Sequence, residues 1–106
     1  MSKAVSEIQD EIQMVEQMIL RLRRGTDDAW SYVNSNMEEL ICRMMEIVKW
    51  AQKLVENGQD FPIDVILQQV QNLNEAYTGK DEVLLADTLE YEITNALYVY
   101  LEKGEE

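Results

Sequence analysis

The sequence predicts an all-α protein, an antiparallel up-down-up-down four-helix bundle formed by a single domain over residues 1–106. Four long segments repeat their apolar residues at alternating three- and four-residue steps, which is the period of an amphipathic helix. Each segment ends at one of the four glycines of the chain, Gly25, Gly58, Gly79 and Gly104. Glycine is readily accommodated in the left-handed conformation just past a helix C-terminus. Because the connections are short, consecutive helices should run antiparallel.

The first predicted helix covers residues 3–24 and the second covers residues 27–57. The stripe of the first comprises Val5, Ile8, Ile12, Val15, Ile19 and Leu22, with Met14 and Met18 beside it. Its opposite, polar face comprises Glu7, Asp10, Glu11, Gln13 and Glu16. Thr26 is the expected N-cap of the second helix. The tripeptide from Asn34 to Asn36 favours helix poorly, and Asn36 with Glu39 resembles a capping box, but the uninterrupted apolar phase predicts a continuous helix.

The third predicted helix covers residues 62–78 and the fourth covers residues 81–103. Pro62 suits the first turn of a helix, where its missing N–H would have no partner in any case. Asp81 is the expected N-cap of the fourth helix. The central stripe of that helix comprises Ala86, Leu89, Ile93, Ala96 and Tyr100, flanked by Leu85, Leu97 and Leu101.

The chain is strongly acidic, with 21 acidic and 9 basic residues and a formal net charge of −12. This charge argues against nucleic acid and against anionic membrane surfaces as partners. A single cysteine, Cys42, permits no intrachain disulfide, which is typical of a reducing compartment. Since the N-terminal residues do not resemble a secretion signal and no apolar run approaches ~20 residues, we expect a cytoplasmic protein.

The chain contains no histidine. Its absence excludes the Glu-x-x-His di-iron motif, histidine zinc sites and histidine-based catalytic triads. Carboxylates remain as candidates for magnesium binding, namely Glu38 in the second helix with Asp87 and Glu90 in the fourth. All-helical nucleotide pyrophosphatases use similar pairs, but here the order of Asp87 and Glu90 is reversed and Glu38 lacks a partner at Ile41. We therefore assign no catalytic residue, no metal site and no cofactor.

Apolar residues in the fourth segment exceed what one buried stripe requires. Leu84, Tyr91 and Tyr98 follow at seven-residue steps and form a second line beside the core stripe. This line is either covered within the bundle or used as an interface, and tyrosine suits an interface because it joins a large apolar body to a polar tip. We favour the interface.

The segment from Asp81 to Ile93 resembles a pattern found in small all-helical proteins of Gram-positive bacteria with no known activity. That pattern reads Asp-x-Val-Leu-Leu-Ala-Asp-x-Leu-Glu-Tyr-Glu and then Ile or Leu, and Asp81, Val83–Asp87 and Leu89–Ile93 match it. The chain departs from the pattern at Thr94–Ala96, where a proline is expected. The resemblance implies a helical fold and implies neither a ligand nor site residues.

Two functional hypotheses follow. The first is a non-enzymatic protein-interaction module, an adaptor or chaperone-like acidic bundle that forms a homodimer or binds a partner helix. Its support is the line of Leu84, Tyr91 and Tyr98, together with six methionines, since methionine-rich surfaces adapt to varied partners. Small acidic chaperones of bacterial flagellar and secretion systems are analogous at the level of fold. The alternative is a magnesium-dependent nucleoside phosphate hydrolase that uses Glu38, Asp87 and Glu90.

Overall fold

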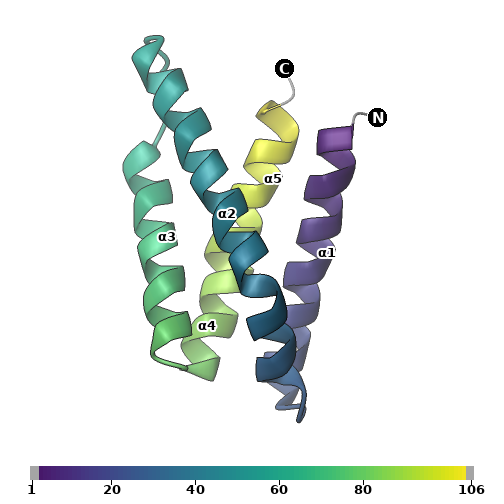
Figure 1. Ribbon diagram of the computed structural model, residues 1–106. Coiled ribbons are helices and arrows are strands. Elements are labelled where there is room, and N and C mark those ends of the chain that lie inside the picture. The colour runs from purple at the N-terminus through teal and green to yellow at the C-terminus, as the bar shows by residue number, and fades with distance from the viewer. Residues whose placement is uncertain (1–2, 105–106) are drawn as a thin grey trace.

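The structure is a computed structural model that describes residues 3–104. Within this range the chain forms α1 (Lys3–Arg24), α2 (Ala29–Glu56), α3 (Ile63–Thr78) and a fourth rod (Figure 1). The fourth rod consists of α4 (Glu82–Thr88), a π-helical turn η1 (Leu89–Ile93) and α5 (Thr94–Lys103). The all-α class and the four-helix bundle are confirmed, with helix bounds within about two residues of the predicted ones.

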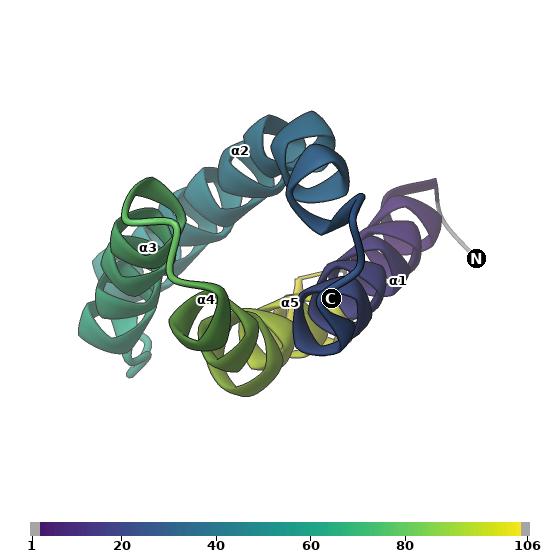
Figure 2. The same cartoon turned by 90° about the horizontal axis from the view of Figure 1, so that it is seen from below.

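The four rods form a closed ring, seen along its axis in Figure 2. α1 packs against α2 on one side and against α4, η1 and α5 on the other, while α3 packs against α2, α4 and η1. α1 and α3 are therefore the diagonal pair. The molecule measures 46 × 30 × 19 Å, and its long dimension is close to the ~42 Å expected for the 28 residues of α2.

The predicted apolar stripes converge on one core along the axis of the bundle. Met18, Leu40, Leu73 and Leu97, one from each rod, are at most 1% exposed. Each such side chain contributes roughly 1.5–3 kcal/mol relative to leaving it exposed. The core therefore holds the surface features described below on rigid helices.

The helix ends match the predictions in part. Gly25 and Gly58 adopt the left-handed conformation (φ of 65° and 84°), but Gly79 and Gly104 do not. After α3 it is Lys80 that takes the left-handed position, with φ of 52°. The prediction of a left-handed glycine after the third and fourth helices was therefore wrong.

Of the two predicted N-caps, one is confirmed and one is wrong. Asp81 caps α4 as expected, because its side chain accepts a hydrogen bond of 3.0 Å from the backbone N–H of Leu84. Thr26 is not the N-cap of α2. Its hydroxyl instead donates to Asp28 (2.7 Å), and the helix begins at Ala29, whose N–H bonds the Thr26 carbonyl (3.1 Å). Thr26 and Asp28 thus form a turn that precedes the helix.

α2 is continuous through the segment from Asn34 to Asn36, as predicted. Two of its polar side chains bond backbone carbonyls one turn earlier. Ser35 donates to Ser31 (2.9 Å) and Asn36 donates to Tyr32 (2.9 Å). These bonds give the two side-chain donors partners within the helix, and α2 stays helical through this segment.

The π-helical turn interrupts the fourth rod and was not predicted. At its end the backbone N–H of Thr94 bonds the carbonyl of Leu89, five residues earlier, and the Thr94 hydroxyl donates to the same carbonyl (2.8 Å). A π-turn takes up one residue more than an α-turn. Residues on either side of η1 are therefore out of the seven-residue register that a continuous α-helix would give them.

Candidate functional site

The three residues predicted to form an interface are all exposed in the described chain. Leu84 is 48% exposed, Tyr91 is 68% exposed and Tyr98 is 43% exposed. Their core neighbours Leu85, Leu89 and Leu97 are fully buried. The second apolar line is therefore not covered by the protein's own bundle.

The π-turn changes which of these residues share a face. Val83 lines a hollow whose other wall is the end of α1, and Tyr98 lines a second hollow whose other wall is the middle of α1, from Gln9 to Glu16. Leu84 is one residue beyond Val83 and so is rotated by about 100° around the helix. The structure therefore places Val83 and Tyr98 at the edge next to α1, with Tyr91 between them along the rod and within the electrostatic reach of Arg23, while Leu84 is turned away from that edge. Val83, 69% exposed, was missed because a seven-residue count does not include it.

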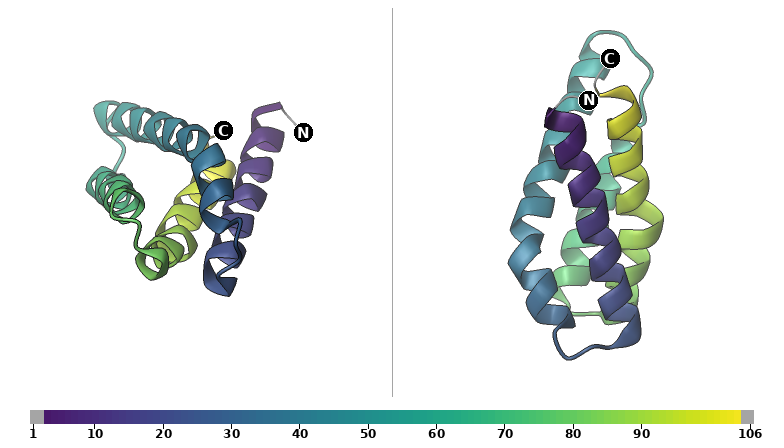
Figure 3. Two further views of the ribbon diagram at one scale, coloured as in Figure 1. Left: turned by 60° about the horizontal axis from the view of Figure 1, so that its bottom comes forward. Right: turned by 90° about the vertical axis from the view of Figure 1, so that its right-hand side faces the viewer.

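α1 supplies the other half of this surface, which we call the α1–α5 face. It comprises Leu20 and Arg23 from α1 with Val83, Tyr91 and Tyr98 from the fourth rod. Leu20 is 39% exposed. Figure 3 (right) looks onto α1 with the fourth rod beside it. The hollow near Val83 has a volume of about 380 Å³ and the one near Tyr98 about 410 Å³, and they lie toward opposite ends of the face.

A polar cluster holds the two halves of the face together. Arg23 donates to Asp87 (2.9 Å) and to Glu90 (3.4 Å), which ties the end of α1 to the fourth rod. The Glu90 carboxylate, the largest cause, raises the pKa of Tyr91 above its ordinary value, whereas the charge of Arg23 opposes that shift. Tyr91 thus lies next to this ion-paired cluster.

The carboxylates of the hydrolase hypothesis do not meet in one site. Asp87 and Glu90 lie next to α1 and are paired with Arg23. Glu38 lies on α2, where it lines a hollow next to α3 with Asn34 and Tyr77. Within residues 3–104, no group of three acidic or cysteine side chains is placed to hold a metal ion.

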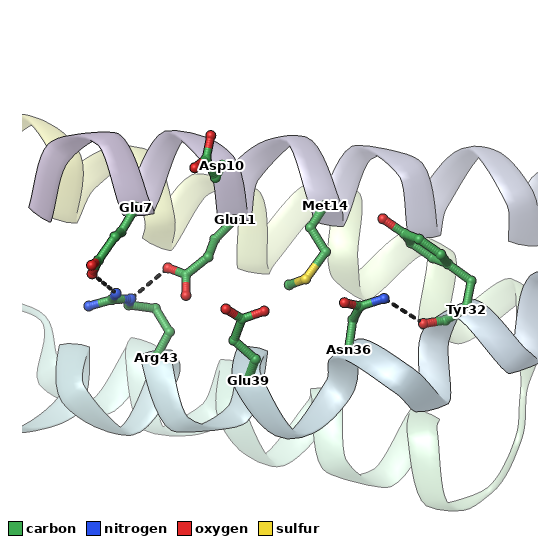
Figure 4. Close-up of a pocket in the computed structure, with 8 residues that line it drawn as sticks. All are labelled: Glu7, Asp10, Glu11, Met14, Tyr32, Asn36, Glu39 and Arg43. Carbon is green, nitrogen blue, oxygen red and sulfur yellow. Dashed lines mark hydrogen bonds and ion pairs between the residues drawn. The ribbon is translucent and has the colours of Figure 1, made fainter. Parts of the chain in front are cut away.

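A groove between α1 and α2 contains a second cluster of charged side chains, in which Arg43 is paired with Glu7 and Glu11. The residues that line it are Glu7, Asp10, Glu11, Met14, Tyr32, Asn36, Glu39 and Arg43 (Figure 4). Its volume is about 510 Å³. We call it the α1–α2 groove.

Arg43 organises one end of this groove. Its guanidinium donates to Glu11 (2.6 Å), to Glu46 (2.6 Å) and to Glu7 (3.4 Å). The expectation that Glu11 lies on the exposed face of the first helix was wrong, because its side chain is 8% exposed. Burial raises the pKa of Glu11 above its ordinary value, and the hydrogen bond from Arg43 opposes that shift. The groove is therefore held closed by its own chain at this end.

The remaining candidates from the sequence lie elsewhere. Cys42 is an exposed free thiol on α2. Among the methionines, Met18, Met37 and Met44 belong to the core, Met14 is half-buried and Met45 is exposed. Met1 lies outside the described residues. Within residues 3–104, the methionines therefore provide no continuous adaptable surface.

Compared with known protein families, curated proteins and solved structures, the chain shows no significant match. The resemblance of the segment from Asp81 to Ile93 to a bacterial family stays a prediction. Within residues 3–104, no helix combines the length and the apolar content that crossing a bilayer requires.

Proposed function

We propose that this protein is a non-enzymatic protein-interaction module, adaptor-like or chaperone-like, that binds another polypeptide through the α1–α5 face. The observation that carries the proposal is the exposure of Val83 (69%) and Tyr91 (68%) on a rod whose core residues Leu85, Leu89, Ile93 and Leu97 are fully buried. Water-exposed apolar side chains gathered on one face, with a polar cluster at their edge, are typical of a protein-binding surface.

The magnesium-dependent hydrolase is supported less well. Its carboxylates Asp87 and Glu90 already neutralise Arg23, and Glu38 lies on another side of the bundle. A hydrolase would need inward, convergent carboxylates to bind the metal ion. A rise in the thermal midpoint on adding magnesium or manganese would revive this alternative.

The proposal is tested by placing a photoreactive amino acid at position 91 of the full chain, in the cells that produce it. Illumination should give a covalent product larger than the monomer. Val65 on α3 offers a matched control position, since it is 53% exposed and apolar but lies on the rod diagonal to α1. A product from position 91 and none from position 65 supports the proposal. Absence of any larger product from position 91 contradicts it.

A further inference from the structure

The features of the α1–α5 face are arranged so that the face is complementary to a second, antiparallel copy of itself. Tyr91 follows Val83 by eight residues and precedes Tyr98 by seven. At 1.5 Å per residue, the projecting Val83 and the hollow beside Tyr98 therefore lie about 12 Å and about 10 Å to either side of Tyr91. The projection and the hollow are nearly equidistant from one central side chain.

α1 shows the same arrangement, with a residue of opposite charge on each side of Leu20. Leu20 lies four residues after Glu16 and four residues before Arg24, so the three residues share one stripe of the helix. Glu16 lines the hollow at the Tyr98 end, and Arg24 lines the hollow at the Val83 end. An acid and a base thus lie at equal distances, about 6 Å along the helix, on opposite sides of Leu20.

Leu20 and Tyr91 lie at the same level of the bundle. α1 and the fourth rod run antiparallel, and Arg23 pairs with both Asp87 and Glu90. Leu20, three residues before Arg23, therefore lies at the level of Tyr91. The pair formed by Val83 and the Tyr98 hollow and the pair formed by Arg24 and Glu16 are therefore centred at the same level of the bundle.

We propose that the occupant of the α1–α5 face is a second copy of this chain, packed antiparallel about a twofold axis at Leu20 and Tyr91. This inference rests on the proposed function and names its partner. Around such an axis the same patch serves both copies. Val83 enters the hollow beside Tyr98 of the partner subunit, Tyr91 meets its own counterpart, and Arg24 faces Glu16 of the partner subunit.

The distribution of charge is compatible with this arrangement. Two copies of a chain with a net charge of −12 repel each other at long range. However, Arg23 and Arg24, which border the α1–α5 face, offset part of the negative charge of Glu16, Glu82, Asp87 and Glu90 there, and Arg23 is paired with Asp87 and Glu90. At physiological ionic strength repulsion beyond about 8 Å is screened. The dimer should therefore strengthen as salt rises from low to physiological, whereas a complex with a basic partner would weaken.

The test is the mass of the purified full chain by analytical ultracentrifugation, from about 1 μM to about 500 μM, the range of moderate dimer dissociation constants. We expect a concentration-dependent shift to twice the monomer mass. Tyr91→Glu should weaken the dimer at least about tenfold, because it places a charge at the centre of the interface. Val65→Glu, at an apolar position on α3 that is 53% exposed, should leave it unchanged. Circular dichroism checks that both variants stay helical.

A charge exchange tests the twofold contact itself. Arg24→Glu and Glu16→Arg should each weaken the dimer by about fivefold, since each places like charges opposite one another. The double variant Arg24→Glu with Glu16→Arg should return the dissociation constant to near the wild-type value. Failure of the double variant to recover contradicts the antiparallel register.

Two results would overturn the homodimer. A monomer mass at every concentration, together with a product of a different protein cross-linked at position 91, contradicts the homodimer and leaves the proposed function standing. A dimer that Tyr91→Glu does not weaken shows that the copies meet elsewhere, and the inferred interface is then wrong.

Discussion

α1 borders two surfaces that treat polar and apolar side chains in opposite ways. In the α1–α2 groove the carboxylate of Glu11 is 8% exposed and paired with Arg43. On the α1–α5 face the aromatic side chain of Tyr91 is 68% exposed. A charged group is thus buried where the chain supplies its partner, and an apolar group is exposed where the chain supplies none. The first surface is completed within the chain, and the contrast supports the proposal that the second surface binds another molecule.

The two rods that pack against α1, α2 and the fourth rod, also differ from each other. α2 is an uninterrupted α-helix of 28 residues, whereas the fourth rod contains η1. π-turns are rare, arise from the insertion of one residue and occur frequently at functional sites. Here the inserted turn lies beside the α1–α5 face and contains Tyr91, its most central residue.

The largest expected effect is the difference between deleting one residue from the fourth rod and deleting one residue from α2. Deleting Tyr91 lets η1 close into an α-turn, so the protein should stay helical and unfold cooperatively. Deleting the exposed Glu38 from α2 should unfold the protein, because it rotates the buried Leu40, Met44 and Ile47 by about 100° and each costs several kcal/mol when removed from the core. Circular dichroism during thermal unfolding measures both. Unfolding of the Tyr91 deletion would show that η1 is required for the fold.

A smaller effect is expected from replacing Arg43 or Arg23, which should lower the free energy of unfolding by different amounts. Arg43→Met leaves Glu11 buried without its cation and should lower the free energy of unfolding by about 2–3 kcal/mol, somewhat less than for a fully buried pair because Glu11 keeps some contact with water. Arg23→Met should change it much less, since Arg23, Asp87 and Glu90 are each more than a third exposed. Urea denaturation at neutral pH gives both values. The combination of Glu11→Leu with Arg43→Met should recover most of the loss, and equal losses for the two arginines would contradict the comparison.

The smallest effect concerns pH. Because the pKa of Glu11 is raised above its ordinary value of 4.5, the folded protein binds its proton more tightly than the unfolded chain does. This stabilisation is present below the ordinary pKa and is lost as pH rises through the folded pKa. The free energy of unfolding of the wild type, minus that of Glu11→Gln, should therefore fall as pH rises toward neutrality. The lowered pKa of Asp28 acts in the opposite direction but is common to both proteins, so it cancels. A difference that rises with pH would show that pairing with Arg43 outweighs burial.

The sequence predicts the helices well because each apolar stripe reports locally on the face that its helix buries. The core residues Ile8, Val15, Leu89 and Ile93 all belong to the predicted stripes and are at most 1% exposed. The predicted interface residues are likewise exposed. These properties depend on spacing along one helix, so no knowledge of a neighbouring helix is needed.

Features that depend on two helices were missed. Glu11 counts as a surface residue until Arg43 is brought to it from 32 positions away, although its spacing from Ile8 and Val15 places it near the core stripe. The sequence does contain a pattern that could have predicted η1. Leu85, Leu89, Ile93 and Leu97 follow at steps of four and are all fully buried. In a continuous α-helix that run would drift by about 120°, so one turn must be wider.

One end of the bundle is closed by aromatic rings instead of aliphatic packing. Trp50 of α2 meets Phe61 at 5.0 Å and Tyr100 of α5 at 5.1 Å, both edge to face. Trp30 lies twenty residues earlier, about 30 Å away along α2, where its indole N–H donates to Glu82 (3.2 Å). The two tryptophans of the chain therefore give each end of the molecule its own fluorophore, one in an aromatic and one in a carboxylate environment. With either tryptophan replaced by phenylalanine, the emission that remains reports on the opening of a single end.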